Sequence, residues 1–76
     1  MAKVVLPELG ENITKVTVSY WFFQPGQKVE EKQDLVELAT DKATFNLPSS
    51  SSGILKKIYI QEGDVANVGD VLAEIE

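Results

Sequence analysis

Charged side chains are the only chemically active groups that this sequence offers in number: seven lysines and twelve aspartates and glutamates. It has no histidine, cysteine or arginine, so the commonest general base, thiolate nucleophiles and cysteine-ligated zinc are all excluded. The acidic pairs Glu30–Glu31 and Glu37 with Asp41 have no base partner, and we interpret them as solvated surface residues. The chain is therefore either a binding module or a protein whose chemistry is brought in on a cofactor.

Length and composition place these side chains on one small globular domain. A chain of 76 residues, 43% hydrophobic and 25% charged, is neither a disordered tail, a collagen-like rod nor a membrane span. The net charge of −5 repels phosphate backbones, so nucleic acid is a poor partner. The opening residues hold no long apolar stretch, so we expect a cytoplasmic location, or the mitochondrial matrix if a transit peptide has been removed.

Short apolar runs separated by turn signals predict an all-β domain, because none of them keeps a helical period over three turns. We expect strands at residues 16–23, 35–40, 43–47, 54–60 and 70–75. Gln24-Pro25-Gly26-Gln27 has the proline and the glycine that a type II turn favours. Short strands at intervals of roughly ten residues are typical of an antiparallel sandwich or barrel.

A weak internal repeat predicts that the domain has two similar halves. A shift of 37 residues aligns two turns and two leucines: Gln24–Gln27 with Gln61–Asp64, and Leu35 with Leu72. Leu6-Pro7 recurs as Leu47-Pro48 at a shift of 41. The repeat predicts approximate two-fold symmetry, with each half supplying one sheet.

Only the first half continues beyond its last strand, into Thr40-Asp41-Lys42-Ala43, and we expect this continuation to be a hairpin tip. Pairing Thr40 with Ala43 creates one apolar face: Leu38 opposite Phe45, and Val36 opposite Leu47. Asp41 and Lys42 are then the two loop residues. Loops this short prefer Asn-Gly or Asp-Gly, so an Asp-Lys pair is either a hint of function or a solvated lysine on a type I turn.

The run Glu37-Leu38-Ala39-Thr40-Asp41-Lys42-Ala43 strongly resembles the lipoyl-lysine motif of lipoyl domains, which occur in the dihydrolipoyl acyltransferases of 2-oxo acid dehydrogenase complexes. The resemblance covers the whole chain. Residues 5–13 resemble the family's opening strand and surface loop, residues 52–55 the step after the lipoyl hairpin, and residues 61–64 and 69–76 its closing strands. By this resemblance, residues 1–76 are a single lipoyl domain from the N-terminus of a longer multidomain acyltransferase.

The resemblance implies a flattened barrel of two four-stranded antiparallel sheets with quasi two-fold symmetry. It implies lipoate joined as an amide to Lys42, forming a swinging arm on a monomeric, non-catalytic carrier domain without metal or membrane contacts. The arm would take acyl groups from a thiamine-diphosphate 2-oxo acid dehydrogenase to coenzyme A at the acyltransferase catalytic core, and electrons to dihydrolipoyl dehydrogenase. Asp41 and Ala43 would be read by lipoate ligase or lipoyl transferase, and the loop Gly10-Glu11-Asn12 would help partners to recognise the domain.

Alternatives to a lipoyl domain remain open at this point. A biotinyl domain shares the implied fold, but biotin carriers resemble Met-Lys-Met at the tip, and the only methionine here is Met1. The glycine-cleavage carrier also bears lipoyl-lysine but is larger, and an unmodified β-barrel interaction module would fit the composition. We interpret Trp21 as half-buried core rather than as a binding residue.

Two residues depart from the family pattern. Lys32 stands where the family often has glycine, which implies a turn without positive φ at that position. Ala39 stands where the family often has a glutamate, which leaves the cognate dehydrogenase, and therefore the 2-oxo acid, undetermined.

Overall fold

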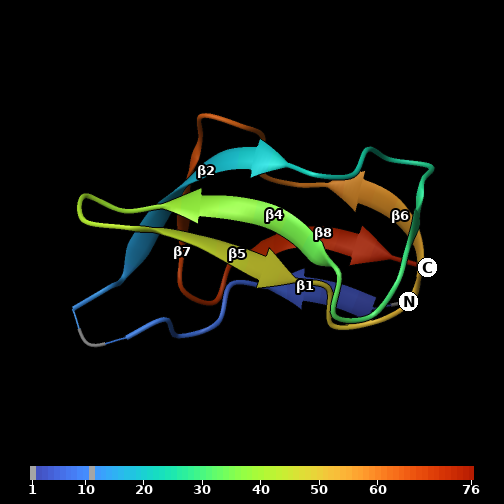
Figure 1. Cartoon of the computed structure of the whole chain (residues 1–76), viewed down its shortest axis with the longest axis horizontal. Coiled ribbons are helices and arrows are strands. Elements are labelled where there is room, and N and C mark those ends of the chain that lie inside the picture. The colour runs from blue at the N-terminus through green and yellow to red at the C-terminus, as the bar shows by residue number, and fades with distance from the viewer. Residues whose placement is uncertain (1, 11) are drawn as a thin grey trace.

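The structure is a computed structural model that describes residues 2–10 and 12–76. Its described residues form eight strands: β1 (Ala2–Val5), β2 (Lys15–Trp21), β3 (Lys28–Val29), β4 (Asp34–Ala39), β5 (Thr44–Pro48), β6 (Gly53–Ile58), β7 (Val65–Asn67) and β8 (Val71–Ile75). They build two antiparallel four-stranded sheets, here called the hairpin sheet (β5-β4-β2-β7) and the opposite sheet (β1-β8-β6-β3) (Figure 1). The predicted all-β class and the pair of four-stranded sheets are confirmed. No helix long and apolar enough to cross a membrane occurs among these residues.

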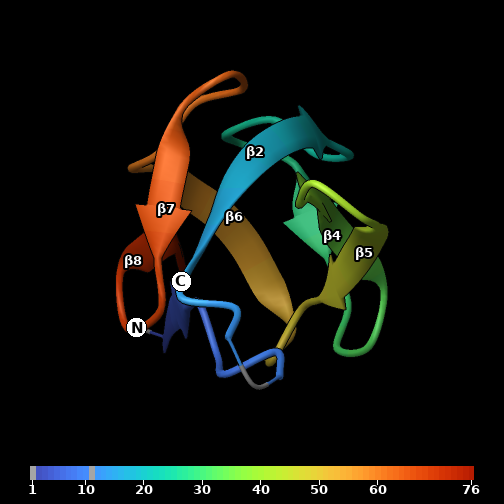
Figure 2. The ribbon, with the colours of Figure 1, turned by 90° about the vertical axis from the view of Figure 1, so that its left-hand side faces the viewer.

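The two sheets pack face to face as the layers of a sandwich, and the quasi two-fold axis relates one to the other (Figure 2). The 37-residue shift holds in the hydrogen bonds: Gly26 N donates to Leu55 O, and its counterpart Gly63 N donates to Val18 O, both at 2.7 Å. The prediction that each half supplies one sheet is wrong, because each sheet takes two strands from each half. The edge strands β1 and β3 of the first half join β8 and β6, and the edge strands β5 and β7 of the second half join β4 and β2. Of these, β3 and β7 have only two and three residues, too few to show a periodicity in the sequence.

The prediction that pairs Leu6-Pro7 with Leu47-Pro48 is also wrong. Leu47 pairs with Val36 in β4 and Val4 pairs with Ala73 in β8, so Leu47 corresponds to Val4, at a shift of 43. The counterpart of Leu6 is therefore Ser49, and both are buried. The hydroxyl of Ser49 donates to Ser51 O at 2.6 Å, which satisfies a polar group where the other half has a leucine.

The interior is a single apolar cluster to which both sheets contribute. Leu35 and its repeat mate Leu72 are both fully buried in it. Trp21 is 2% exposed, and its indole N–H donates to Ile60 O at 3.0 Å. The interpretation of Trp21 as a core residue is confirmed, with the ring more deeply buried than expected.

Four turns that consist entirely of described residues have a hydrogen bond from the fourth residue to the first and a positive φ at the third, as type II turns do: Gln24–Gln27, Glu30–Gln33, Gln61–Asp64 and Asn67–Asp70. The second of them overturns the expectation for Lys32. Lys32 has a φ of +74°, in the left-handed region, at the third position of the turn Glu30–Gln33. Its repeat mate is Gly69, with a φ of +95°. The turn is held from outside, because Lys32 N donates to Ser49 O at 2.9 Å and Ser49 N donates to Gln33 O at 2.8 Å. These tertiary hydrogen bonds outweigh the cost of a left-handed lysine, which is on the order of 1 kcal/mol.

We expect Lys32→Gly to stabilise the domain by about 0.5–1 kcal/mol, because glycine adopts this φ without strain. The measurement is the urea denaturation midpoint. Gly69→Ala is the matched control, since a Cβ at Gly69 would meet no atom within 4 Å. Any loss of stability in the Gly69→Ala variant therefore comes from the backbone conformation alone. An unchanged or lower midpoint for Lys32→Gly would show that the turn carries no strain.

Candidate functional site

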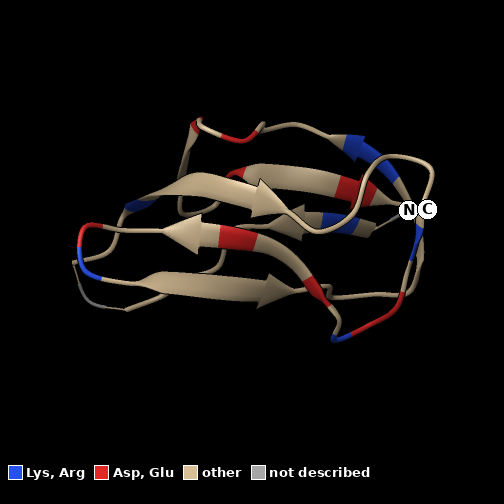
Figure 3. Ribbon diagram, turned by 45° about the horizontal axis from the view of Figure 1, so that its top comes forward, with Lys and Arg blue, Asp and Glu red and all other residues tan. Residues whose placement is uncertain are grey.

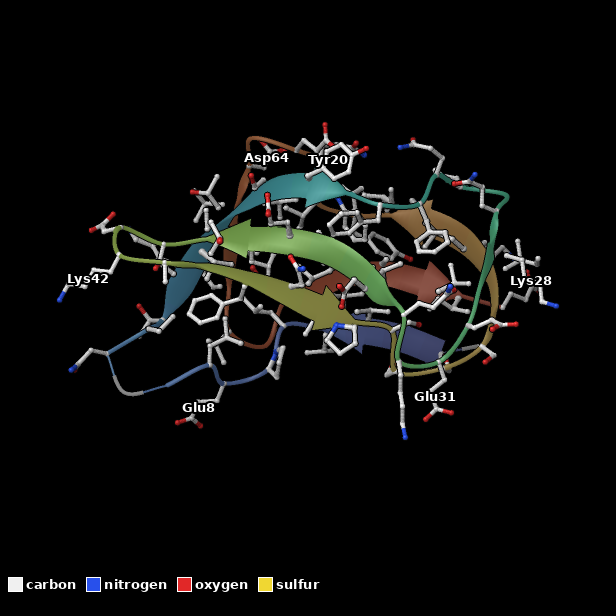
Figure 4. The ribbon with its side chains drawn as sticks, viewed as in Figure 1. Glu8, Tyr20, Lys28, Glu31, Lys42 and Asp64 are labelled. Atoms are coloured by element: carbon white, nitrogen blue, oxygen red, sulfur yellow. The ribbon has the colours of Figure 1, made fainter. Side chains whose placement is uncertain are left out.

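The β4–β5 hairpin presents Lys42 at one end of the molecule, opposite the end where both chain termini lie (Figures 1 and 4). The register is the predicted one, with Leu38 opposite Phe45 and Val36 opposite Leu47. Thr40 N donates to Ala43 O at 2.8 Å and closes the loop, of which Asp41 and Lys42 are the two exposed central residues. Neither has a positive φ, so the loop is not the primed turn that short hairpins favour.

Thr40 holds this unfavoured loop in shape, a role that the sequence did not reveal. Its Oγ1 accepts hydrogen bonds from Ala43 N at 3.2 Å and from Lys42 N at 3.4 Å. The same hydroxyl lies 3.1 Å from Ala43 O, to which it can donate. The signal in the sequence was a threonine directly before a two-residue loop, since its hydroxyl can replace the backbone contacts of a better turn.

Residues of the loop before β2 face the hairpin across an open groove. Ile13 N donates to Gly10 O at 3.3 Å, and Asn12 has a φ of +68°, so the chain reverses sharply here. Gly10 and Asn12 are exposed, whereas Glu11 lies outside the described residues. The open groove, of about 620 Å³, is lined by residues 12–17 and 39–43 together with Phe45 and Val65. Asn12, Asp41, Lys42 and Ala43 all line this groove, but Gly10 does not.

The chemistry available at the tip is that of an accessible primary amine. Within residues 2–10 and 12–76 the one ion pair joins Lys56 to Glu76 at 2.9 Å, so no described carboxylate is paired with Lys42. The hydrogen bond and the charge of Glu76 raise the pKa of Lys56, which makes that amine a poorer nucleophile. No cluster of three or more metal-ligating side chains occurs in the described part of the chain. The exposed Lys42 amine is a group that an acylating enzyme can reach.

Comparison with known proteins agrees with this arrangement. The family model for biotin and lipoyl attachment, described as "Biotin-requiring enzyme", matches residues 2–75. The chain is 39% identical over 75 residues to the dihydrolipoyllysine-residue succinyltransferase component of the Bacillus subtilis 2-oxoglutarate dehydrogenase complex. It is 38% identical over 71 residues to the corresponding acetyltransferase component of the Staphylococcus aureus pyruvate dehydrogenase complex. The matches cover 99% and 93% of this chain but only 18% and 16% of those relatives.

Solved structures show the same fold. The lipoyl domain of the Azotobacter vinelandii 2-oxoglutarate dehydrogenase complex superposes with a TM-score of 0.79 at 26% identity, covering 100% of this chain and 96% of that one. The Kluyveromyces lactis urea carboxylase matches with a TM-score of 0.65 at 21% identity, over 99% of this chain and 7% of that one, and this likeness concerns the fold alone. The chain belongs to the biotin- and lipoyl-attachment family, as a non-catalytic carrier domain of the lipoyl type.

Proposed function

We propose that this domain carries lipoate as an amide on Lys42 and moves it between the active sites of a 2-oxo acid dehydrogenase complex. The observation that carries the proposal is the position of the Lys42 amine, exposed at the tip of a hairpin that is closed by the hydrogen bond from Thr40 N to Ala43 O. When attached, lipoate supplies a disulfide that can take up an acyl group and two electrons, which none of the protein side chains can do.

Lipoate is favoured over biotin by the relatives rather than by the fold. The relatives that are 35–39% identical are dihydrolipoyllysine or lipoamide acyltransferase components, whereas the urea carboxylase match shows only the fold. At the tip, Asp41 and Ala43 flank the lysine, and both are exposed where a modifying enzyme can read them.

The proposed partners are a thiamine-diphosphate dehydrogenase, an acyltransferase core and dihydrolipoyl dehydrogenase. Asn12 lines the same groove as Lys42, which supports a role for this loop in how a partner enzyme recognises the tip. Each contact must be weak, because the arm has to leave one active site to reach the next. Tethering within one complex makes weak contacts sufficient by raising the local concentration.

Intact-mass measurement tests the cofactor directly. The unmodified domain is incubated with lipoate ligase, lipoate and ATP, and separately with biotin ligase, biotin and ATP. We expect one lipoyl increment per chain in the first reaction and no biotinyl increment in the second, because the residues beside Lys42 are Asp41 and Ala43 rather than methionines. A biotinyl increment without a lipoyl one would replace this proposal by the biotin carrier, and no increment in either reaction would leave an unmodified interaction module.

A further inference from the structure

The quasi two-fold symmetry allows the outer faces of the two sheets to be compared position by position. On the opposite sheet, Glu74 of β8 lies between Lys3 of β1 and Lys57 of β6 in the pairing register. On the hairpin sheet the equivalent glutamate is Glu37 of β4, which lies between Asn46 of β5 and Tyr20 of β2. Both lysines are thus replaced by uncharged residues on the sheet that carries Lys42.

The opposite sheet satisfies its glutamate internally. Tyr59 donates its phenol hydroxyl to Glu74 Oε2 at 2.6 Å, which raises the pKa of Tyr59 above its usual value. Lys57 Nζ lies 4.9 Å from the centroid of the Tyr59 ring, so one lysine contacts an aromatic face beside a carboxylate. On this sheet the Tyr59 ring therefore contacts both a lysine and a carboxylate of the protein itself.

The hairpin sheet has the ring and the carboxylate but lacks the cation. Tyr20 lies in β2 and is 51% exposed, and Phe22 follows the end of β2 and is 42% exposed. Their rings pack edge to face with centroids 5.1 Å apart. Glu37 lies directly across from Tyr20 and has no salt bridge or side-chain hydrogen bond with any described residue. We call Tyr20, Phe22 and Glu37 the aromatic-acidic patch. In Figure 3 the red segment of β8 lies between strands β1 and β6, which carry blue, whereas β4 carries red and its neighbour β2 carries blue only at its start.

We propose that the aromatic-acidic patch is a docking site for an exposed arginine or lysine of the dehydrogenase that loads the arm. The cation would pair with Glu37 and stack on the Tyr20 ring, which stands where the opposite sheet has Lys57. It would supply the positive charge that Lys57 supplies beside Tyr59 and Glu74. The net charge of −5 favours encounter with a basic surface. Tyrosine and phenylalanine are also enriched at protein interfaces, as is arginine, which would be the partner's contribution here.

The position of the patch relative to Lys42 supports a dehydrogenase as the occupant. Glu37 and Lys42 are five residues apart along the same hairpin, which at the rise of a strand is roughly 15 Å. A partner seated on the patch would therefore hold the tip of the hairpin at a fixed place beside it. The choice of a dehydrogenase as the partner rests on the proposed function. The observation that the aromatic-acidic patch has no cation within the described part of the protein does not depend on it.

The test uses the domain without lipoate, so that binding is separated from modification. The ¹⁵N-labelled domain is titrated with purified thiamine-diphosphate dehydrogenases from pyruvate, 2-oxoglutarate and branched-chain complexes, and amide shifts give each Kd. Glu37→Gln and Glu74→Gln are matched variants at equivalent positions of the two sheets. We expect Glu37→Gln to weaken the strongest of these interactions at least about threefold and Tyr20→Ala roughly tenfold, with Glu74→Gln unchanged. The dispersion of the amide spectrum verifies that each variant is folded.

Several outcomes would overturn the docking proposal. One is that Glu37→Gln and Glu74→Gln change the Kd equally, and another is that neither Glu37→Gln nor Tyr20→Ala changes it. The proposal also fails if the domain binds none of the three dehydrogenases, or if sedimentation shows that it self-associates through the patch. Intact mass after incubation with lipoate ligase is measured on the same variants. A patch variant that gains its lipoyl increment but keeps full binding overturns the docking site alone, whereas a wild-type domain that gains no increment overturns the proposed function.

Discussion

Lys42→Arg is expected to abolish lipoylation completely while leaving the fold intact. Arginine keeps the positive charge at the tip but offers no amine that can form the amide, so the ligase has no substrate group. Lys42 is exposed in the loop, where its side chain makes no described hydrogen bond or ion pair, and a surface substitution of this kind changes stability by about 0.5 kcal/mol or less. The measurements are intact mass after incubation with lipoate ligase and the urea denaturation midpoint.

Lys32→Arg is the matched control, because Lys32 is also exposed and lies in a turn rather than within a strand. We expect this variant to gain one lipoyl increment, as the unsubstituted domain does. Peptide mapping of the modified domain should then find the increment on Lys42. An increment at Lys56 or Lys57 in the Lys42→Arg variant would contradict the assignment of the tip as the attachment site.

The site can be predicted from the sequence to the extent that it depends on strand alternation. The apolar positions Val36, Leu38, Phe45 and Leu47 share one face of a sheet when the chain reverses at Asp41 and Lys42. That reversal also places each of the four opposite an apolar partner, and this pairing, together with the alternation, predicts the register of the hairpin and the two residues of its loop. Alternation says nothing of side-chain hydrogen bonds, and the role of Thr40 therefore could not be predicted from it.

Features set by contacts distant in sequence could not be predicted. Lys32 adopts a left-handed conformation because Ser49, 17 residues further along the chain, accepts a hydrogen bond from Lys32 N and donates one to Gln33 O. Local propensity alone disfavours that conformation for a lysine. The correspondence of Leu6 with Ser49 was missed for a related reason, since the equivalence lies in the backbone pairing and the two side chains have nothing in common. The aromatic-acidic patch likewise depends on the register, which places Glu37 beside Tyr20.

Truncating Leu35 or its repeat mate Leu72 to alanine is expected to cost roughly 2–5 kcal/mol in each case. Both side chains are fully buried, and each leaves a cavity that the surrounding strands cannot fully close. A domain of this size has a free energy of unfolding on the order of 5 kcal/mol, so either variant should lose a large share of its stability. The measurement is urea denaturation at constant pH, with the midpoints compared at equal slopes.

The two variants also test the symmetry of the core. Because Leu35 and Leu72 occupy equivalent positions in β4 and β8, their losses should agree more closely with each other than with that of an exposed residue. Val65→Ala is the matched control, since Val65 lies in a strand but is 54% exposed, and we expect it to cost about 0.5 kcal/mol or less. A nearly silent substitution at either leucine would mean that its half of the sandwich does not depend on the core that the repeat builds.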